Sequence, residues 1–475
     1  MESALPTPHA PGIDGAAASA PDARLIERFD TTGPRYTSYP TADRFAEDFD
    51  DRALEAWLRR RASTVGHAPL SVYVHVPFCE SVCWYCACNK IATRDRRRGV
   101  AYVEDLTREI GLYAARLSRR EPVSQLHLGG GTPTFLDDAA LRTLVDALER
   151  GFAFTAGAER SIEVDPRTVD AERLRALARL RFDRLSFGVQ DFDADVQRAV
   201  HRVQSTAQVF ELTRAARDIG FASINVDLIH GLPRQTASSF GRTLDTLCEL
   251  RPDRVAVYGY AHLPERFKPQ RRIDAGALSG AGERVAMMRA AAGRLGAEGY
   301  VHIGMDHFAL PGDALAVAQR RGTLHRNFMG YTTQPDCDML GLGVSAIGRM
   351  GPCYAQNHRT LDEWADAVRG GRLPIARGIE LDRDDMLRRS TIMAIMCGGE
   401  VSFAALESGY LVDPRRVFAE ELRELRELEA LGLVRVDADG IAVTGTGRFF
   451  VRPVAMTFDR YLRAARRRAG CSSVL

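Results

Sequence analysis

The chain has 475 residues, of which 45% are hydrophobic and 27% charged, and its formal net charge is +2. This composition is typical of a soluble globular protein with two or three domains, or with one large domain and appendages. The small net charge argues against a nucleic-acid-binding protein, and no apolar run is long enough to span a bilayer. The N-terminus lacks the basic and apolar regions of a signal peptide, so we expect a cytoplasmic protein.

The N-terminal region has two parts. Residues 1–22 are rich in Ala and Pro without periodicity, so we expect a disordered tail. Residues 23–65 include the segment GPRYTSYPTADRF (33–45), which has too many aromatic and turn residues for a linker. We therefore expect 23–65 to be an extension that packs on the domain that follows.

From residue 71 onward, short apolar strands alternate with amphipathic helices. The expected strands are 71–76, 123–128, 160–164, 183–188, 223–229 and 254–260, and the expected helices are 101–119, 138–150, 170–180, 205–219, 236–249 and 280–298. This alternation predicts a parallel sheet with right-handed crossovers. Six units are fewer than a closed eight-stranded barrel needs, so we expect a partial (β/α)6 barrel within residues 66–375. A doubly wound sheet is the alternative.

Polar or glycine-rich residues lie at the end of each predicted strand. GGGTPTF (129–135) follows the second strand, Glu163 ends the third, and HGLP (230–233) follows the fifth. In parallel α/β folds, ligands bind at the carboxyl ends of the strands. A ligand site is therefore expected at this edge of the sheet.

The loop after the first strand carries four of the nine cysteines: Cys79, Cys83, Cys86 and Cys88. The other five are scattered, which indicates a metal site in a reducing compartment rather than a disulfide framework. The first three follow the pattern C-x₃-C-x₂-C and would leave a four-iron cluster one ligand short. The alternatives are structural zinc held by all four, or unliganded cysteines. Zinc usually draws its cysteine pairs from two separate hairpins, so the spacing favours iron–sulfur.

The alternation of strands and helices stops near residue 382. Residues 384–397 and 414–431 are expected to be helices, and 433–443 a β-hairpin. These elements predict a smaller, winged-helix-like C-terminal domain at 376–460, followed by a basic tail at 461–475. The domain is not strongly basic, so we expect it to pack or to cover substrate rather than to bind DNA.

C-x₃-C-x₂-C after a first strand resembles the radical S-adenosylmethionine (SAM) superfamily, and GGGTPT looks like its glycine-rich motif. A closer resemblance is to the bacterial oxygen-independent coproporphyrinogen III oxidase family, and it spans about residues 30 to 455. The motifs that carry it are HVPFCESVCWYCACNK, HLGGGTPTFL, IEVDPR, LSFGVQDF, HRVQ, NVDLIHGLP, YAHLP, GMDHFA, NFMGYTT and GVSAIG.

The resemblance implies a [4Fe–4S] cluster on Cys79, Cys83 and Cys86 and two SAM molecules. Cys88 would be a catalytic residue that does not ligate the cluster. The positions that match contacts to the first SAM are Tyr73, Gly130, Glu163 and Ile347. Those that match contacts to the second are Tyr85, Gly131, Thr132, Gln190, Arg202, Asp227 and Ala261.

The implied reaction belongs to heme biosynthesis. A 5′-deoxyadenosyl radical takes a hydrogen atom from a propionate β-carbon, and loss of CO₂ and one electron leaves a vinyl group. Two such steps convert coproporphyrinogen III into protoporphyrinogen IX. The expected partner is a reduced electron donor such as flavodoxin or ferredoxin, with no nucleic acid, no membrane and a monomeric chain. The alternative is a heme chaperone of the same superfamily without decarboxylase activity, but that branch typically lacks a cysteine at the position of Cys88.

Overall fold

The structure is a computed structural model that describes residues 22–29, 33–117 and 119–468. The tail expected at 1–22 lies almost wholly outside the described residues, as does the end of the basic tail. The chain divides into two compact units, which we call the barrel unit (Phe45–Met287 and Asp336–Glu380) and the C-terminal unit (Met1–Arg44, Met288–Pro335 and Leu381–Leu475). The domain boundaries drawn from the sequence remain predictions.

The sheet of the barrel unit has the strand order β16-β15-β14-β13-β1-β4-β5-β6-β7-β8. From β1 to β8 each strand runs parallel to the next. Because each of these strands lies beside the one before it, the order never reverses, whereas a doubly wound sheet needs a reversal. The partial (β/α)6 barrel is therefore confirmed. Its parallel strands are β1 (Leu70–Val76), β4 (Pro122–Gly130), β5 (Ala153–Val164), β6 (Arg184–Gln190), β7 (Ser223–His230) and β8 (Arg254–Gly259).

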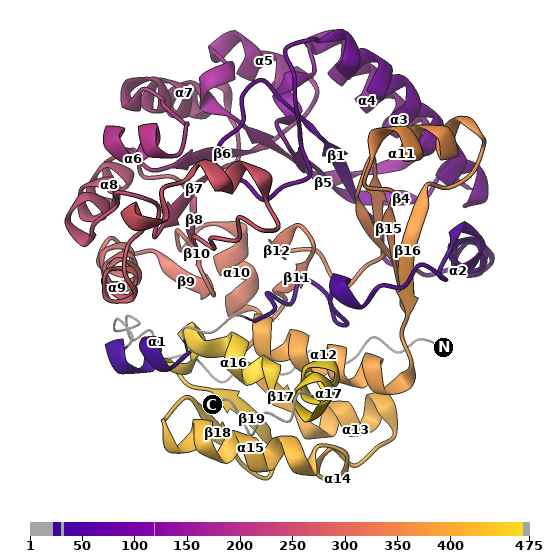
Figure 1. The fold of residues 1–475 in the computed structure, drawn as a ribbon. Helices are drawn as coiled ribbons and strands as arrows, with labels where there is room; N and C mark the ends of the chain where they lie inside the picture. Colours follow the sequence, from indigo (N-terminus) through magenta and orange to yellow (C-terminus); the bar gives the residue numbers. More distant parts are fainter. Residues whose placement is uncertain (1–21, 30–32, 118, 469–475) are drawn as a thin grey trace. The chain divides into compact units, whose positions relative to one another are not determined.

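The helices of the barrel unit lie around the outside of this curved sheet (Figure 1). Several begin at a side-chain cap, such as Asp137, which accepts from the Ala140 amide, and Thr236, which forms a capping box with Ser239. The helices are α2 (Asp51–Ser63), α3 (Arg97–Arg116), α4 (Asp138–Gly151), α5 (Ala171–Arg179), α6 (Ala194–Ala199), α7 (Thr206–Ile219), α8 (Ala237–Leu250) and α11 (Leu361–Arg369). The short 3₁₀ helices are η2 (Pro133–Phe135), η3 (Pro166–Thr168), η4 (Lys268–Arg272) and η5 (Ala275–Ala277).

Four further strands extend the sheet beyond β1, and the sequence analysis did not predict them. They are β13 (Met339–Leu342), β14 (Ile347–Met350), β15 (Cys353–Asn357) and β16 (Ile375–Glu380). β13 runs parallel to β1, and the other three continue the sheet antiparallel. Arg61 of α2, 3% exposed, pairs with Glu121 (2.8 Å) and Asp338 (2.6 Å), the residues that precede β4 and β13. This buried triad ties α2 to the two strands on either side of β1.

In its described residues the C-terminal unit contains three β-hairpins and a helical region. Its elements are α1 (Ala23–Phe29), η1 (Ala42–Arg44), β9 (Val301–Gly304), β10 (His307–Ala309), α10 (Ala314–Arg320), β11 (His325–Asn327), β12 (Gly330–Thr332), α12 (Arg383–Cys397), β17 (Glu400–Ser402), α13 (Phe403–Tyr410), α14 (Pro414–Val417), α15 (Ala419–Ala430), β18 (Val434–Val436), β19 (Gly440–Val443), η6 (Gly447–Phe450), α16 (Val451–Met456) and α17 (Arg460–Arg468). Helix α9 (Ala281–Ala297) crosses the boundary between the units.

The winged-helix-like arrangement expected near the C-terminus is present. The expected helix at 384–397 is α12, and the expected hairpin is β18–β19, joined by β17 into a three-stranded sheet of order β17-β19-β18. The single helix expected at 414–431 is wrong, because the chain breaks into α14 and α15 at Phe418. The Phe418 ring is fully buried and packs edge-on against Phe458 at 5.1 Å between centroids. At Phe418 the backbone leaves the helical region, with φ of −100° and ψ of 26°, so one helix ends there and the next begins.

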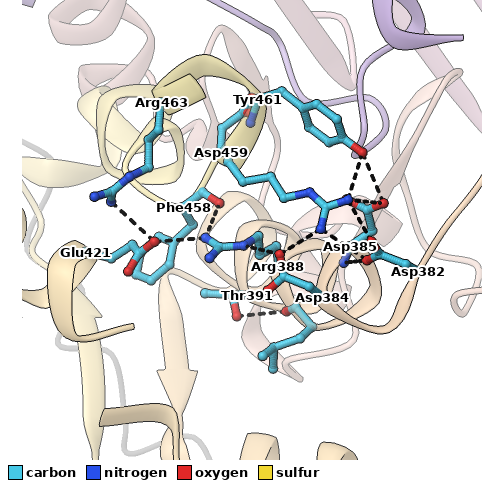
Figure 2. Close-up of polar contacts among 12 residues, drawn as sticks. Asp382, Asp384, Asp385, Arg388, Thr391, Glu421, Phe458, Asp459, Tyr461 and Arg463 are labelled. Carbon is cyan, nitrogen blue, oxygen red and sulfur yellow. Dashed lines mark hydrogen bonds and ion pairs between the residues drawn. The ribbon is translucent and has the colours of Figure 1, made fainter. Parts of the chain in front are cut away.

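An ion-pair network joins α12, α15 and α17 within the C-terminal unit (Figure 2). Arg388 of α12 pairs with Asp384 (2.8 Å) and with Glu421 of α15 (2.9 Å). Arg463 of α17 also reaches Glu421 (3.3 Å). One acidic residue thus receives basic side chains from two other helices.

Candidate active site

The cysteine loop leaves β1 at the carboxyl edge of the barrel sheet and is closed by a short parallel pairing. β2 (Phe78–Cys79) pairs with β3 (Ile91–Ala92), and the Ile91 amide donates to the Pro77 carbonyl (2.7 Å). The glycine-rich turn after β4 holds the same segment, since the Thr132 amide donates to the Phe78 carbonyl (2.8 Å). The four cysteines therefore lie on a loop whose two ends are pinned together.

Gly131 explains why glycine is needed at this turn. A Cβ on Gly131 would lie 2.7 Å from the Pro77 carbonyl oxygen and 2.8 Å from that of Phe78, too close for any side chain. Gly130 has φ of +115°, a conformation that residues with a side chain rarely adopt. The motif GGGTPT thus lets two backbone segments approach closely beside the cysteines.

The three predicted cluster ligands each sit near a hydrogen-bond donor or cation. Cys79 and Cys83 are buried, and the Thr132 hydroxyl donates to Cys79 Sγ (3.5 Å). A hydrogen bond from Cys88, assisted by the Lys90 ammonium, lowers the pKa of the Cys86 thiol to about 6 despite its burial. Metal binding requires thiolates, so donors beside the sulfurs suit a ligand role.

Two arginine side chains lie beside the Cys83 sulfur. Arg202 Nη1 lies 3.3 Å and Arg167 Nη2 3.6 Å from Cys83 Sγ, and both guanidiniums also contact Asp165. Burial raises the pKa of the Asp165 carboxyl, but the two cations lower it by a larger amount. The net pKa lies below its ordinary value, and the carboxyl stays ionised. The sequence analysis named Arg202 and missed Arg167, although Arg167 lies in the IEVDPR motif.

Among the described residues, no three His, Cys, Asp or Glu side chains are close enough together to hold a single metal ion. A four-iron cluster binds each cysteine through a different iron, so its ligands stand further apart than those around one ion. The tetrahedral zinc alternative would need all four sulfurs to converge on one ion.

The positions predicted for the first SAM lie on neighbouring strands. In the register of the sheet Tyr73 of β1 is level with Gly341 of β13 on one side and with His127 of β4 on the other. A Cβ on Gly341 would lie 2.5 Å from the carbonyl carbon of Ile347, so Ile347 is also at this level. Glu163 is two residues beyond Ser161, the partner of His127. The structure thus brings Tyr73, Ile347 and Glu163 to one side of the sheet edge.

Glu163 joins this group to the glycine turn. Its Oε2 accepts from the Gly130 amide (3.0 Å), and His127 Nε2 lies 3.5 Å from Oε1. Burial raises the pKa of the carboxyl, but His127 and the Gly130 amide lower it by a larger amount. The net pKa lies below its ordinary value, so Glu163 is an anion at neutral pH. The side chain remains 42% exposed. An accessible carboxylate of this kind is suited to accept hydrogen bonds from a ligand.

Two histidines near Tyr73 were missed by the sequence analysis. His75 Nδ1 is 3.0 Å from the Tyr73 hydroxyl, and its Nε2 is 2.9 Å from the Asn89 carbonyl at the far end of the cysteine loop. The His127 ring stacks on Tyr73 at 5.9 Å. A period of two along β1, with Tyr73 and His75 pointing to the same face, was the available signal.

The positions predicted for the second SAM lie in two places. Gly131 and Thr132 follow β4, beside Gly130 and the cysteine loop, whereas Gln190, Asp227 and Ala261 lie at or just beyond β6, β7 and β8. Gln190 ends β6 with φ of +73°. Asp227 of β7 accepts from Asn225 Nδ2 (2.9 Å) and from the Ser186 hydroxyl (3.3 Å). Ala261, just beyond β8, is exposed. Gln190, Asp227 and Ala261 are therefore separate along the sheet from Tyr73 and Ile347, whereas Gly131 and Thr132 adjoin the first set at Gly130.

Gln270 connects Ala261 to the cysteine loop, and nothing in the sequence indicated it. The side chain is 1% exposed, and its Nε2 donates to the carbonyls of Tyr85 (3.0 Å) and Ala261 (3.2 Å). Its Oε1 accepts from the Leu263 amide (2.6 Å). The Tyr85 ring itself packs against an apolar cluster of Val196, Val200, Ile229 and Leu232. Gln270 and this cluster together position Tyr85, the residue before Cys86.

Comparisons with known proteins give the class and the family of the chain. Residues 73–247 match the radical SAM superfamily profile, and residues 381–450 match the HemN C-terminal domain. Barrel, cysteine loop and profile together define a radical SAM enzyme, a class that uses a [4Fe–4S] cluster and SAM.

The relatives narrow this class. An oxygen-independent coproporphyrinogen III oxidase of Pseudomonas aeruginosa is 48% identical over 94% of this chain and 97% of its own length. One of Escherichia coli is 46% identical over 96% and 98%. A solved structure, "Coproporphyrinogen III oxidase (HemN) from Escherichia coli is a Radical SAM enzyme", shares 45% identity with a TM-score of 0.88 and covers 93% of this chain and 99% of that one. The chain belongs to the oxygen-independent coproporphyrinogen III oxidase family.

Proposed function

We propose that the chain converts two propionate side chains of coproporphyrinogen III into vinyl groups without oxygen and so yields protoporphyrinogen IX. The observation that carries this proposal is the pinned loop with Cys79, Cys83 and Cys86 beside the glycine turn of a radical SAM barrel, in a chain whose full-length relatives are named for this reaction.

Cys79, Cys83 and Cys86 would hold the cluster, and the absence of a fourth ligand leaves an iron for SAM. When bound, the cluster and SAM supply one-electron chemistry that ends in a carbon radical able to take a hydrogen atom from a propionate β-carbon. The protein's part is to bind, orient and shield. Arg202 and Arg167 beside Cys83 balance thiolate charge, and the Glu163 carboxylate offers a hydrogen-bond acceptor to the first SAM.

Polar or exposed positions at the ends of β6, β7 and β8 (Gln190, Asp227 and Ala261), away from Tyr73 and Ile347, support a second SAM. Tyr73, Gly130, Glu163 and Ile347 are proposed to contact the first molecule. Tyr85, Gly131, Thr132, Gln190, Arg202, Asp227 and Ala261 are proposed to contact the second. We further propose a reduced donor such as flavodoxin or ferredoxin, a monomeric chain in the cytoplasm, and no nucleic-acid or membrane partner. In the described part of the chain, helices of the length and apolar character that a membrane crossing requires are absent.

Cys88 is the proposed catalytic cysteine outside the cluster. It is exposed, whereas Cys79 and Cys83 are buried, and its thiol contacts Cys86. We expect Cys88→Ser to keep the iron content of the purified protein and to lose vinyl product. Loss of iron together with activity would instead make Cys88 a structural residue.

The decisive experiment is an anaerobic assay with SAM, dithionite and coproporphyrinogen III, with divinyl product resolved from monovinyl intermediates. We expect a brown, oxygen-sensitive protein that forms protoporphyrinogen IX, and we expect Cys83→Ala to lose cluster and activity together. A Cys83→Ala variant that stays active would refute the assignment. A brown protein without product would point to the heme-chaperone alternative, which the names of the relatives do not favour. A colourless protein with stoichiometric zinc would refute both.

A further inference from the structure

Three arginines from distant parts of the sequence meet inside the C-terminal unit, outside the site described above. Arg35 lies in the N-terminal segment, Arg326 in β11 and Arg452 in α16. They surround Asp306, in the tight turn between β9 and β10 where Met305 has φ of +51°. We call these four residues the arginine cluster. Its members influence one another electrostatically, since Arg452 is affected by Arg35, Asp306 and Arg326.

The negative charge of Asp306 is already balanced by a partner within the cluster. Arg35 Nη2 donates to its Oδ2, and His307 Nδ1 lies 2.8 Å from Oδ1. Burial raises the pKa of the carboxyl, but Arg35 and His307 lower it far below its ordinary value. Burial lowers the pKa of His307, so the ring is neutral and adds no positive charge. The single carboxylate therefore balances one guanidinium.

Arg326 is a buried cation without a counterion. Its exposed fraction is 6%, its Nε donates to the Arg35 carbonyl (3.3 Å), and its guanidinium lies 4.6 Å from the centroid of the Tyr331 ring. Its Nη1 is buried and has no hydrogen-bond partner among the residues that the structure describes. Leaving a buried guanidinium nitrogen unpaired is unfavourable unless a ligand pairs with it.

Arg452 adds a second uncompensated charge. Its Nε donates to the Pro34 carbonyl (3.1 Å) and its Nη2 to the Gly33 carbonyl, both neutral acceptors. Burial, reinforced by the nearby Arg35, lowers the pKa of Arg452. Within the described chain neither Arg452 nor Arg326 forms an ion pair. The cluster therefore holds two more cations than anions in a half-buried setting.

We propose that the arginine cluster is a binding site for a ligand carboxylate, with Arg326 Nη1 as its principal donor, and that this carboxylate belongs to a propionate of the tetrapyrrole substrate. This inference rests on the proposed function. The planar guanidinium fork matches a carboxylate in two parallel hydrogen bonds, which a lysine could not do. The tetrapyrrole carries carboxylates and no phosphate, so a carboxylate is the anion expected here.

A purely structural role for Arg326 predicts something different. If stacking on Tyr331 and the bond to the Arg35 carbonyl were its purpose, Arg326→Met would lower the thermal midpoint of the ligand-free protein. A ligand site instead carries an electrostatic strain that the ligand relieves. Arg326→Met should then leave the midpoint unchanged or raise it, while ligand affinity falls.

The test uses the full chain and coproporphyrin III, the fully oxidised and unreactive porphyrin with the same propionates. Fluorescence titration should give a Kd that rises at least about tenfold in Arg326→Met, in line with the loss of a charge-assisted pair. Arg326→Lys, which keeps the charge and loses the fork, should fall between. The matched control is Arg423→Gln, because Arg423 is exposed on α15 of the same unit. Its Kd should stay within about twofold of wild type.

Equal Kd values for wild type, Arg326→Met and Arg326→Lys would overturn the inference, as would a wild-type protein that does not bind coproporphyrin III. A thermal midpoint raised by inorganic phosphate and not by propionate would overturn the carboxylate assignment. Binding is measured without turnover, so its result is separate from the decarboxylation assay. A wild-type chain that binds through Arg326 but makes no product would sink the proposed function and support the ligand site.

Discussion

At the scale of single residues, Gln270 is the side chain whose role is most sharply defined by its contacts. Its amide satisfies the Tyr85 and Ala261 carbonyls and the Leu263 amide while almost fully buried. Gln270→Ala leaves these groups unpaired. This should lower the free energy of unfolding by about 1–3 kcal/mol for each buried group left unsatisfied. We expect a higher KM for SAM and fewer irons per chain, because the backbone before Cys86 loses its anchor.

A matched control separates positioning from general destabilisation. Gln319 donates its amide to the carbonyls of His302 (3.1 Å) and Ile303 (2.7 Å) in the C-terminal unit. Gln319→Ala should lower the thermal midpoint without changing iron content or the KM for SAM. If Gln270→Ala behaved in the same way, its role would be structural.

Glu109 is a second single residue, and we expect it to make stability depend on pH. It lies on α3, fully buried, and accepts from the Gly343 amide (2.7 Å), Asn357 Nδ2 (2.8 Å) and Trp364 Nε1 (3.2 Å). Burial raises its pKa to about 8, and the three donors offset this only in part. The folded state therefore keeps a proton that the unfolded state releases above its ordinary pKa of about 4.3.

The sign follows from the linkage between protons and folding. Because the pKa of Glu109 is raised in the folded state, the contribution of this group to the free energy of unfolding is fully present below the unfolded pKa. This contribution is lost as the pH rises toward 8, by at most about 1.4 kcal/mol per pH unit. We expect urea midpoints of the wild type to fall between pH 5 and pH 8 more than those of Glu109→Gln. Parallel curves for the two proteins over this range would mean that Glu109 is ionised throughout.

At the scale of elements, the start of α12 depends on an ion pair with α17. Arg460 pairs with Asp382 (2.8 Å), Asp384 (2.9 Å) and Asp385 (3.0 Å), and Asp385 is 2% exposed. The Tyr461 hydroxyl also donates to Asp385 (3.1 Å), as Figure 2 shows. Burial raises the pKa of Asp385, and Arg460 partly offsets this.

Removing Arg460 should therefore leave a buried, unpaired carboxylate. We expect Arg460→Met to destabilise the C-terminal unit by roughly 2 kcal/mol, less than for a fully buried pair because Arg460 is 30% exposed. The double variant Arg460→Met with Asp385→Asn should recover part of this loss. Thermal unfolding of all four proteins in a double-mutant cycle measures the coupling, and additive losses would show that the two side chains do not interact.

At the scale of the whole molecule, the two ends of the described chain meet inside the C-terminal unit. Tyr36 and Tyr39 are fully buried, the Tyr36 hydroxyl donates to Asp459 Oδ2 (2.9 Å), and Tyr39 lies 6.0 Å from the Tyr461 ring. The N-terminal segment is thus part of the core of this unit. Each buried aromatic contributes roughly 2 kcal/mol.

Deletion of residues 1–44 should consequently unfold the C-terminal unit. We expect rapid cleavage within residues 381–450 by a dilute protease, whereas deletion of residues 1–21 should leave the cleavage pattern of the full chain. Equal resistance of the two deletions would contradict the packing role of Tyr36 and Tyr39.

The sequence by itself determined the barrel strands, the cysteine loop and the family. Strand periodicity and C-x₃-C-x₂-C are local patterns, legible over a few residues without knowledge of distant contacts. The motifs around Cys79 and Gly130 also carry the resemblance, and it was confirmed by relatives that match nearly the full chain. The detailed ligand and SAM contacts stay predictions.

Only the tertiary structure decided which distant residues meet. The strands β13–β16, the Gln270 anchor and the arginine cluster each join segments far apart in the sequence, such as Arg35 and Asp306. No local pattern encodes such pairs, because they depend on how whole elements pack. The break at Phe418 was likewise not predicted, and its ring packs against Phe458, which is distant in the sequence. Short motifs were therefore enough to predict the chemistry. The positions of the side chains that support it depend on tertiary packing and became known only from the structure.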